Sequence, residues 1–241
     1  MGRIIAFLYG LVSYLIFLGS FLYAIAFIGD FWAPKTINSG ETGSLITAII
    51  IDAILLSLFA IQHSGMARPA FKRWWTKIIP KPVERSTYVL FASLILILMF
   101  WQWRPLNMVI WDIQAQAARA TIWSFYGVGW FIVLSGTHMI SHAHLFGLKQ
   151  VYEHLTGEKP SGPKFMKPGY YKFVRHPLML GFFIAFWATP AMTLGHLLFS
   201  FATTGYILIA LRFEEHDLIK QFGEKYRKYR EEVPMFIPRF W

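Results

Sequence analysis

Two clusters of charged and titratable residues flank a long apolar run in the last third of the chain. The first cluster, Arg175-His176-Pro177, opens the run, and the second, Glu214-Glu215, follows its end. An arginine beside a helix N-terminus offers fixed positive charge to a carboxylate, and two adjacent carboxylates can bind an amino group or ribose hydroxyls. Ionisable groups at both edges of one membrane segment therefore predict a polar ligand held at a membrane face.

Both clusters also have ordinary structural explanations. A basic residue before a helix-starting proline can anchor a helix at the membrane interface, and acids at the start of a helix complement its dipole. The interval from His176 to Glu214 favours the ligand site, because it matches one out-and-back helical hairpin. Such a hairpin would bring both clusters to the same face of the membrane.

Histidines near the predicted ends of two helices form a third candidate group. His138 and His142 are four residues apart and would share one helical face. With His63, which follows another apolar segment, they could ligate zinc or iron. The chain has no cysteine, however, and no nearby acid completes a ligand set. We therefore predict no metal; the histidines either hydrogen-bond to backbone or water, or include one that orients or deprotonates a substrate.

The composition places these residues in a membrane protein. Of the 241 residues, 56% are hydrophobic and only 15% are charged, which is not typical of a soluble domain. The net charge of +10 does not indicate nucleic-acid binding, because Lys and Arg are concentrated next to apolar segments. We predict one domain over residues 1–241. Residues 4–28 form too long an apolar segment for a signal peptide and are expected to be a mature helix.

Four apolar segments are long enough to span a bilayer, namely residues 4–28, 45–61, 86–103 and 120–139. A fifth run, 177–211, contains no Asp, Glu, Lys or Arg. As a single helix it would extend roughly 50 Å, too long for a hydrocarbon core of about 30 Å. Pro190 and Gly195 predict a break, giving a hairpin with arms near 178–189 and 194–211.

The distribution of loop charges supports the hairpin independently. Lys and Arg are dense between the second and third segments, between the fourth segment and the hairpin, and in the tail. The positive-inside rule places these loops and both termini in the cytoplasm. Leu218, Phe222, Tyr226 and Val233 then recur at helical spacing among charges, which predicts an amphipathic cytoplasmic helix. The predicted fold class is all-α: a polytopic membrane helical bundle with about four spanning helices, a C-terminal hairpin and this amphipathic helix.

Two motifs near the C-terminus resemble those of the integral-membrane methyltransferases related to isoprenylcysteine carboxyl methyltransferase and phospholipid methyltransferases. One is Gly-Tyr-Tyr-Lys-Phe-Val-Arg-His-Pro-Leu-Met-Leu-Gly at 169–181, and the other runs from Glu214-Glu215 to Val233-Pro234. The first half of the chain is similar to the bacterial branch of this family that methylates methanethiol. The similar segments include Gln62-His63-Ser64 and Leu145-Phe146-Gly147-Leu148-Lys149-Gln150.

The resemblance implies that S-adenosylmethionine binds at the cytosolic face. Residues 1–140 would then be the four-helix membrane part, and residues 141–241 would hold the cofactor-binding loop, the hairpin and the C-terminal helix. Independently of the resemblance, Tyr170, Tyr171 and Tyr206 are placed where a cationic ligand could meet the face of an aromatic ring. Besides Tyr171, the candidate cofactor-binding residues are those that the resemblance implies: Gln150, Arg175, His176, Pro177, Glu214 and Glu215.

The implied reaction converts methanethiol to dimethyl sulfide in a bacterial cytoplasmic membrane. An alkyl thiol reacts as the thiolate but is mostly protonated at neutral pH. A histidine that takes the proton is therefore expected, and His63 and His142 are both candidates. Membrane lipids are expected neighbours, and no nucleic acid or protein partner is implied. Two alternatives stay open: an isoprenyl-cysteine or lipid substrate, and a histidine-rich haem, metal or transport protein.

Overall fold

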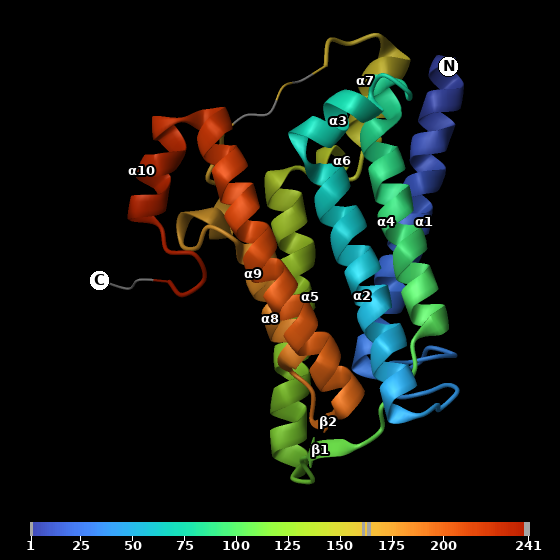
Figure 1. Ribbon diagram of the computed structural model, residues 1–241. Helices are drawn as coiled ribbons and strands as arrows, with labels where there is room; N and C mark the ends of the chain where they lie inside the picture. Colours follow the sequence, from blue (N-terminus) through green and yellow to red (C-terminus); the bar gives the residue numbers. More distant parts are fainter. Residues whose placement is uncertain (1, 161, 163–164, 239–241) are drawn as a thin grey trace. The chain divides into compact units, whose positions relative to one another are not determined.

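The computed structural model describes residues 2–160, 162 and 165–238, and long helices dominate it (Figure 1). Within these described residues, five helices are long and apolar enough to cross a membrane. They are α1 (Arg3–Gly29), α2 (Leu45–Ala67), α4 (Glu84–Gln102, extended at its start by the 3-10 turn η1, Lys81–Val83), α5 (Gln116–Ile140) and α9 (Leu194–Phe222). The predicted all-α polytopic bundle is confirmed.

Shorter elements connect these spans. They are the helices α3 (Pro69–Trp75), α6 (His142–Leu145), α7 (Leu148–Thr156), α8 (Pro177–Trp187) and α10 (Glu224–Glu232), the 3-10 turn η2 (Gly169–Lys172) and the strands β1 (Val109–Asp112) and β2 (Ala191–Thr193). The two strands pair, and the amide of Ile113 donates to the carbonyl of Pro190 at 2.9 Å. Sequence periodicity did not predict this small sheet, because its strands are too short to show alternation.

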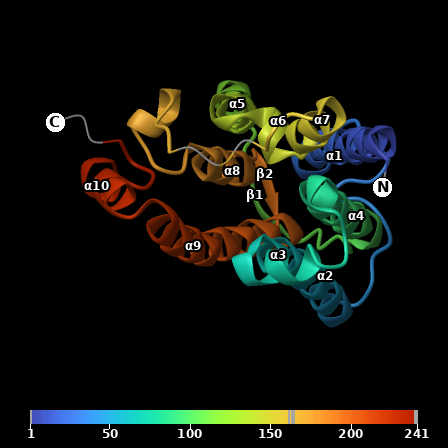
Figure 2. The same cartoon turned by 90° about the horizontal axis from the view of Figure 1, so that it is seen from above.

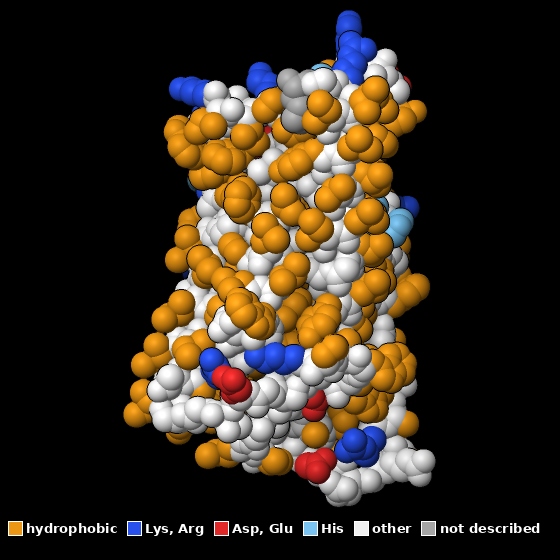
Figure 3. Space-filling view, turned by 90° about the vertical axis from the view of Figure 1, so that its right-hand side faces the viewer, with side chains coloured by type: hydrophobic (Ala, Val, Ile, Leu, Met, Phe, Trp, Pro, Cys, Tyr) orange, Lys and Arg blue, Asp and Glu red, His pale blue; other side chains and the backbone are white. Residues whose placement is uncertain are grey.

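The chain divides into two compact units. Unit 1 contains α1 to α4, α6, α7 and the first residues of α9; there α1 packs on α4 and α7, and α2 packs on α4, as Figure 2 shows. Its outer surface is apolar: Ile5 and Val12 of α1 and Ile46 and Ile54 of α2 are exposed. Hydrophobic side chains cover most of the face in Figure 3, with Lys and Arg gathered nearer its ends. Such a surface suits contact with lipid tails.

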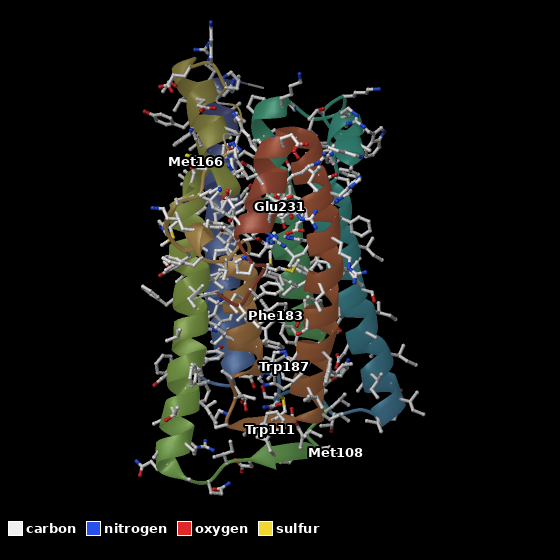
Figure 4. All side chains as sticks on the ribbon, turned by 90° about the vertical axis from the view of Figure 1, so that its left-hand side faces the viewer. Met108, Trp111, Met166, Phe183, Trp187 and Glu231 are labelled. Atoms are coloured by element: carbon white, nitrogen blue, oxygen red, sulfur yellow. The ribbon has the colours of Figure 1, made fainter. Side chains whose placement is uncertain are left out.

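Unit 2 contains β1, α5, η2, α8, α10 and α9 from Leu197 onward. Here α5 and α8 approach closely through Gly129 and Gly181: a Cβ on Gly129 would lie 2.6 Å from the amide nitrogen of Ala185, and one on Gly181 would lie 2.7 Å from the carbonyl oxygen of Gly129. Small residues allow such contacts between membrane helices. Unit 2 also has an apolar cavity of about 350 Å³, lined in part by Trp111 and Trp187 (Figure 4).

The predicted hairpin is confirmed, with one correction. Helix α8 ends at Trp187, Pro190 lies in the turn, and the longer arm begins at Leu194. Within unit 2, Ser200 of α9 donates to the carbonyl of Phe186 of α8 at 2.7 Å. The longer arm does not end near residue 211, however, but continues to Phe222. The helix continues through its charged last turns, because charged side chains do not interrupt backbone hydrogen bonding. Glu214-Glu215 therefore lies inside α9 rather than after it.

The amphipathic segment near the C-terminus was predicted to be one helix, but it belongs to two helices. It is divided at Gly223, whose φ of 57° ends α9 and precedes α10. Positive φ is accessible to glycine at little cost. On the two sides of this break, Tyr226, Tyr229 and Val233 form a buried cluster with Phe222 and other apolar residues. The periodic apolar face was therefore predicted correctly, while the change of helix direction was not.

Candidate functional site

Arg175 is the centre of a polar network in unit 2. Its Nε donates to Glu215 Oε1 at 2.8 Å, and its Nη1 donates to the carbonyls of Arg230 at 3.0 Å and Val233 at 2.5 Å. Its backbone amide donates to the carbonyl of Pro234 at 2.9 Å. The start of α8 is thus joined to α9 and to the C-terminal segment. The prediction that the chain turns back and brings these distant stretches together is confirmed.

Glu215 is the acidic partner of this network. The Nε2 of His176 lies 3.1 Å from Glu215 Oε1, and the Nε of Arg230 lies 3.1 Å from Glu215 Oε2. Only 6% of the Glu215 side chain is exposed, so these partners replace the water that a carboxylate requires. Pro177 follows at the first position of α8, where its missing amide proton is not needed. The two oxygens of Glu215 are occupied by the protein itself.

Glu214 faces differently from its neighbour and is exposed. It acts electrostatically on Tyr171: burial raises the pKa of the Tyr171 hydroxyl, and the negative charge of Glu214 raises it further. The hydroxyls of Tyr171 and Tyr226 are buried and have no hydrogen-bond partner within the described residues. Buried polar groups are rarely left unpaired. Unit 2 therefore offers two phenol groups and one carboxylate that can still accept a polar ligand.

The aromatic side chains around these hydroxyls hold them in place. The hydroxyl of Tyr229 donates to the carbonyl of Tyr171 at 2.7 Å, and burial raises the pKa of Tyr229 to about 12. Burial also raises the pKa of Tyr226, as do the charges of Glu215 and Glu214. All three phenols consequently remain protonated donors near neutral pH. Sequence analysis did not single out Tyr226 as a candidate, because its helical spacing indicated only a core position.

His63 lies in unit 1, within the last turns of α2. The hydroxyl of Tyr88 on α4 is 3.0 Å from each of the two ring nitrogens of His63. The ring of Phe59 stacks on the imidazole with centroids 5.1 Å apart. Phe59, His63 and Met66 follow one another on a single face of α2. That face meets Tyr88, which lies in one buried cluster with Met66. The packing gives the imidazole a defined orientation.

His142 also lies in unit 1 and has a tyrosine partner. Its Nε2 is 2.9 Å from the hydroxyl of Tyr14 on α1, and the centroid of Phe146 is 4.7 Å from that of the imidazole. Phe146 in turn stacks on Phe17 at 3.9 Å. Phe17 and Phe146 both pack against the cluster that contains Tyr88. The structure therefore brings the two candidate bases to the same aromatic cluster.

Gln150 is held on α7 by the residues before it. Its Nε2 donates to the carbonyl of His144 at 3.0 Å, while its Oε1 is buried without a hydrogen-bond partner in the part of the chain that the structure describes. The next residue, Val151, is buried in the cluster with Ala6 and Val83. Packing therefore fixes α7 and leaves the amide oxygen of Gln150 available as an acceptor.

The expectation that His138 and His142 share a helical face is wrong. Helix α5 ends at Ile140, and Ser141 has a φ of 117°, which changes the chain direction before α6 begins. The Nδ1 of His138 lies 2.8 Å from the carbonyl of Leu134 on its own helix. Within the described ranges, no group of three or more His, Asp or Glu side chains has the arrangement of a metal site.

Comparisons with known proteins identify the family. The model of the family described as "NnrU protein" matches residues 53–234. "Methanethiol S-methyltransferase 2" of Bradyrhizobium diazoefficiens is 54% identical over 100% of this chain and 92% of its own length. "Methanethiol S-methyltransferase 1" of the same organism is 52% identical over 98% of this chain and 83% of its own. No solved structure matches.

A third relative extends the match to another bacterial genus. "Methanethiol S-methyltransferase" of Mycobacterium tuberculosis is 50% identical over 99% of this chain and 98% of its own length. The match thus covers both the histidine cluster of unit 1 and the Arg175 network of unit 2, and it confirms the resemblance found in the sequence. The chain belongs to the NnrU family and, within it, to the group that contains these methanethiol S-methyltransferases.

Proposed function

We propose that the protein is a membrane enzyme that transfers a methyl group from S-adenosylmethionine to methanethiol and releases dimethyl sulfide. The observation that carries the proposal is identity of 50% to 54% over nearly the whole chain to relatives bearing the name methanethiol S-methyltransferase. Those names imply a methyl donor, and S-adenosylmethionine is the donor that suits the polar groups of the protein. We further propose that residues 1–241 act as one enzymatic domain.

The unpaired polar groups fit this donor. The exposed carboxylate of Glu214 suits its amino group or ribose hydroxyls, and the hydroxyls of Tyr171 and Tyr226 can donate to its carboxylate. By the resemblance, Gln150 is a further proposed cofactor contact, because its buried Oε1 can accept a hydrogen bond. When bound, S-adenosylmethionine supplies a methyl group on a sulfonium, which is transferred by in-line displacement.

The remaining residues of the proposed cofactor site position the helices that border it. They are Arg175, His176, Pro177 and Glu215. Their mutual hydrogen bonds fix the first turn of α8 next to α9. Because Glu215 is already saturated by cationic groups and His176, it positions its neighbours rather than binding a ligand directly. Glu214, one residue earlier, is the acid that we expect to contact the donor.

The histidines of unit 1 supply the base for the thiol. A thiol becomes a strong nucleophile on losing its proton, and a neutral imidazole within reach can accept that proton. Tyr88 orients His63 and Tyr14 orients His142. The surrounding Phe and Tyr rings suit a small apolar substrate that partitions into the bilayer.

We propose a bacterial cytoplasmic membrane as the location, with both termini in the cytoplasm. The five apolar helices support a multi-pass protein, and the dense Lys and Arg of three chain segments support this orientation. Accessibility labelling of single cysteines introduced near residue 2 and into α10 tests it, because the chain contains no native cysteine. Labelling of either position from the outside would contradict the orientation.

The reaction is tested with purified protein, methanethiol and S-adenosylmethionine labelled in its methyl group. We expect labelled dimethyl sulfide in the gas phase. Labelled lipid or isoprenyl-cysteine, with no labelled sulfide, would support the alternative substrates. Stoichiometric iron or zinc without cofactor binding would point to a metalloprotein instead.

A further inference from the structure

Arg85, at the start of α4, contacts Tyr88, the partner of His63, and α6, the short helix that begins with His142. Its Nε donates to the carbonyl of Leu145 at 2.6 Å, and Leu145 is the last residue of α6, which begins with His142. The guanidinium carbon of Arg85 lies 4.7 Å from the ring centroid of Tyr88. Tyr88 is the residue whose hydroxyl contacts His63. One half-buried cation is therefore placed among the histidines of this unit.

The guanidinium group of Arg85 has no acidic partner in the part of the chain that the structure describes. No carboxylate of the described residues forms an ion pair with it, and its terminal nitrogens make no hydrogen bond within that same part of the chain. Guanidinium groups away from bulk water normally find an anion. Two other half-buried arginines behave differently: Arg175 has Glu215, and Arg104 has Glu41 at 2.5 Å.

The positive charge of Arg85 also affects the pKa of a neighbouring histidine, His144. The pKa of His144 is lowered, first by burial and then by the charge of Arg85. Lys149 and Lys72 act in the same direction, and Glu153 opposes them. Glu153 lies 3.9 Å from Lys149, so its charge is shared with that lysine. The balance of charges around α6 and α7 favours a bound anion.

We propose that Arg85 is the counter-cation of the methanethiolate. This inference rests on the proposed function and adds a binding site for the reacting sulfur. The S–H bond of the thiol breaks, its electron pair stays on sulfur, and the proton goes to a ring nitrogen of His63. Arg85 keeps its own protons and holds the thiolate through its terminal nitrogens. Dimethyl sulfide carries no charge, so the attraction ends once the methyl group has been transferred.

The size of the effect follows from the charge. An opposite charge within about 4–6 Å lowers the pKa of an acid by about 1–3 units. For a thiol that is mostly protonated at neutral pH, each unit gives about tenfold more thiolate. Removing the cation should therefore lower kcat/KM by about tenfold or more. A thiol that is mostly protonated should show this loss in kcat, and a thiol that is already ionised should show it in KM.

The experiment compares wild-type protein with Arg85→Gln, Arg85→Lys and the control Arg73→Gln, which alters an exposed arginine of α3. The substrates are methanethiol and the more acidic trifluoroethanethiol, with saturating S-adenosylmethionine. We expect Arg85→Gln to lose at least tenfold in kcat/KM with both thiols, mainly through a lower kcat for methanethiol and a higher KM for the acidic thiol. Arg85→Lys should retain more activity than Arg85→Gln, and Arg73→Gln should match wild type.

A binding measurement provides a readout that needs no turnover. Thiocyanate, a small sulfur-containing anion, should bind wild-type protein and Arg73→Gln in calorimetry without cofactor, and Arg85→Gln should lose this binding. Thiocyanate should also compete with methanethiol. An unchanged KM for the acidic thiol, or unchanged thiocyanate binding in Arg85→Gln, would overturn the proposal and leave Arg85 as an anchor for α6.

The outcomes separate the two levels of inference. If wild-type protein makes dimethyl sulfide and Arg85→Gln does so equally well, the counter-cation role is wrong and the proposed function stands. If wild-type protein makes none, the proposed function fails, and thiocyanate calorimetry still decides whether Arg85 binds an anion. If Arg85→Gln does not fold, the proposal is tested with Arg85→Lys and with thiocyanate competition in the wild-type protein. Absence of competition between thiocyanate and methanethiol would refute the site.

Discussion

The arginine and histidine groups of the two units differ in how their polar atoms are satisfied. In unit 2, Arg175 and His176 share the buried carboxylate of Glu215. In unit 1, Arg85 has no acidic partner within the described residues, and His63 contacts a neutral tyrosine. A cation paired inside the protein holds elements together, because breaking the pair leaves a buried charge. A cation without such a partner retains its capacity to bind an external anion.

The largest effect is expected from Glu215→Gln, which removes the buried carboxylate of unit 2. This change leaves Arg175 buried without its counter-charge and weakens the contacts to His176 and Arg230. We expect a loss of about 3–5 kcal/mol in the free energy of unfolding, together with loss of cofactor binding. Thermal unfolding in detergent measures the first effect. Glu232→Gln removes an exposed partner of Lys167 and should stay near wild type; similar destabilisation by both variants would contradict the scaffold role.

His63→Ala tests the proposed base in unit 1. Removing a general base typically costs about 10²–10⁴-fold in rate, so we expect such a drop in kcat with cofactor affinity unchanged. The loss should exceed that of His142→Ala, because Tyr88 connects His63 to Arg85. His138→Ala changes an exposed histidine that is bonded to its own helix and serves as the control. A full-rate His63→Ala enzyme across a pH series would remove His63 as the base.

Glu214→Ala sharpens the distinction between neighbouring acids. Since Glu214 is exposed while Glu215 is buried, we expect its loss to leave the folded state intact. Affinity for S-adenosylmethionine should fall by more than tenfold, or at least about 1.4 kcal/mol, as measured by calorimetry. Glu231→Ala on α10, an exposed acid labelled in Figure 4, is the matched control. Unchanged affinity of Glu214→Ala would exclude that carboxylate from the cofactor site.

The smallest expected effect concerns the turn between α9 and α10. Gly223 has a φ of 57°, and Gly223→Ala should cost about 1 kcal/mol of stability, because a side chain disfavours this conformation. No atom lies within 4 Å of a Cβ at either Gly223 or Gly205, so crowding is not the cause. Gly205→Ala, inside α9, should be neutral or stabilising because alanine favours helix. Equal effects of both variants would show that backbone conformation at Gly223 does not matter.

Local features of the sequence were sufficient to predict the membrane segments and the hairpin. The positions of Pro177 and Pro190 and the length of the uncharged run are properties of the chain itself, and helix length is set by bilayer thickness. The same sequence features predicted that Arg175 would meet the acidic cluster. Helix ends were less predictable: the last turns of α9 and the break at Ser141 depend on contacts and backbone angles that spacing does not reveal.

The sequence by itself thus determined the spans, the turn and the family motifs, because hydropathy, proline and residue order act locally. Only the tertiary structure decided which charged side chains are paired with others inside the protein. Glu214 and Glu215 are identical in type, but successive residues of a helix point about 100° apart, so packing buries one and exposes the other. The partners of Arg85 and His63 likewise come from other helices, and no spacing along one segment specifies them.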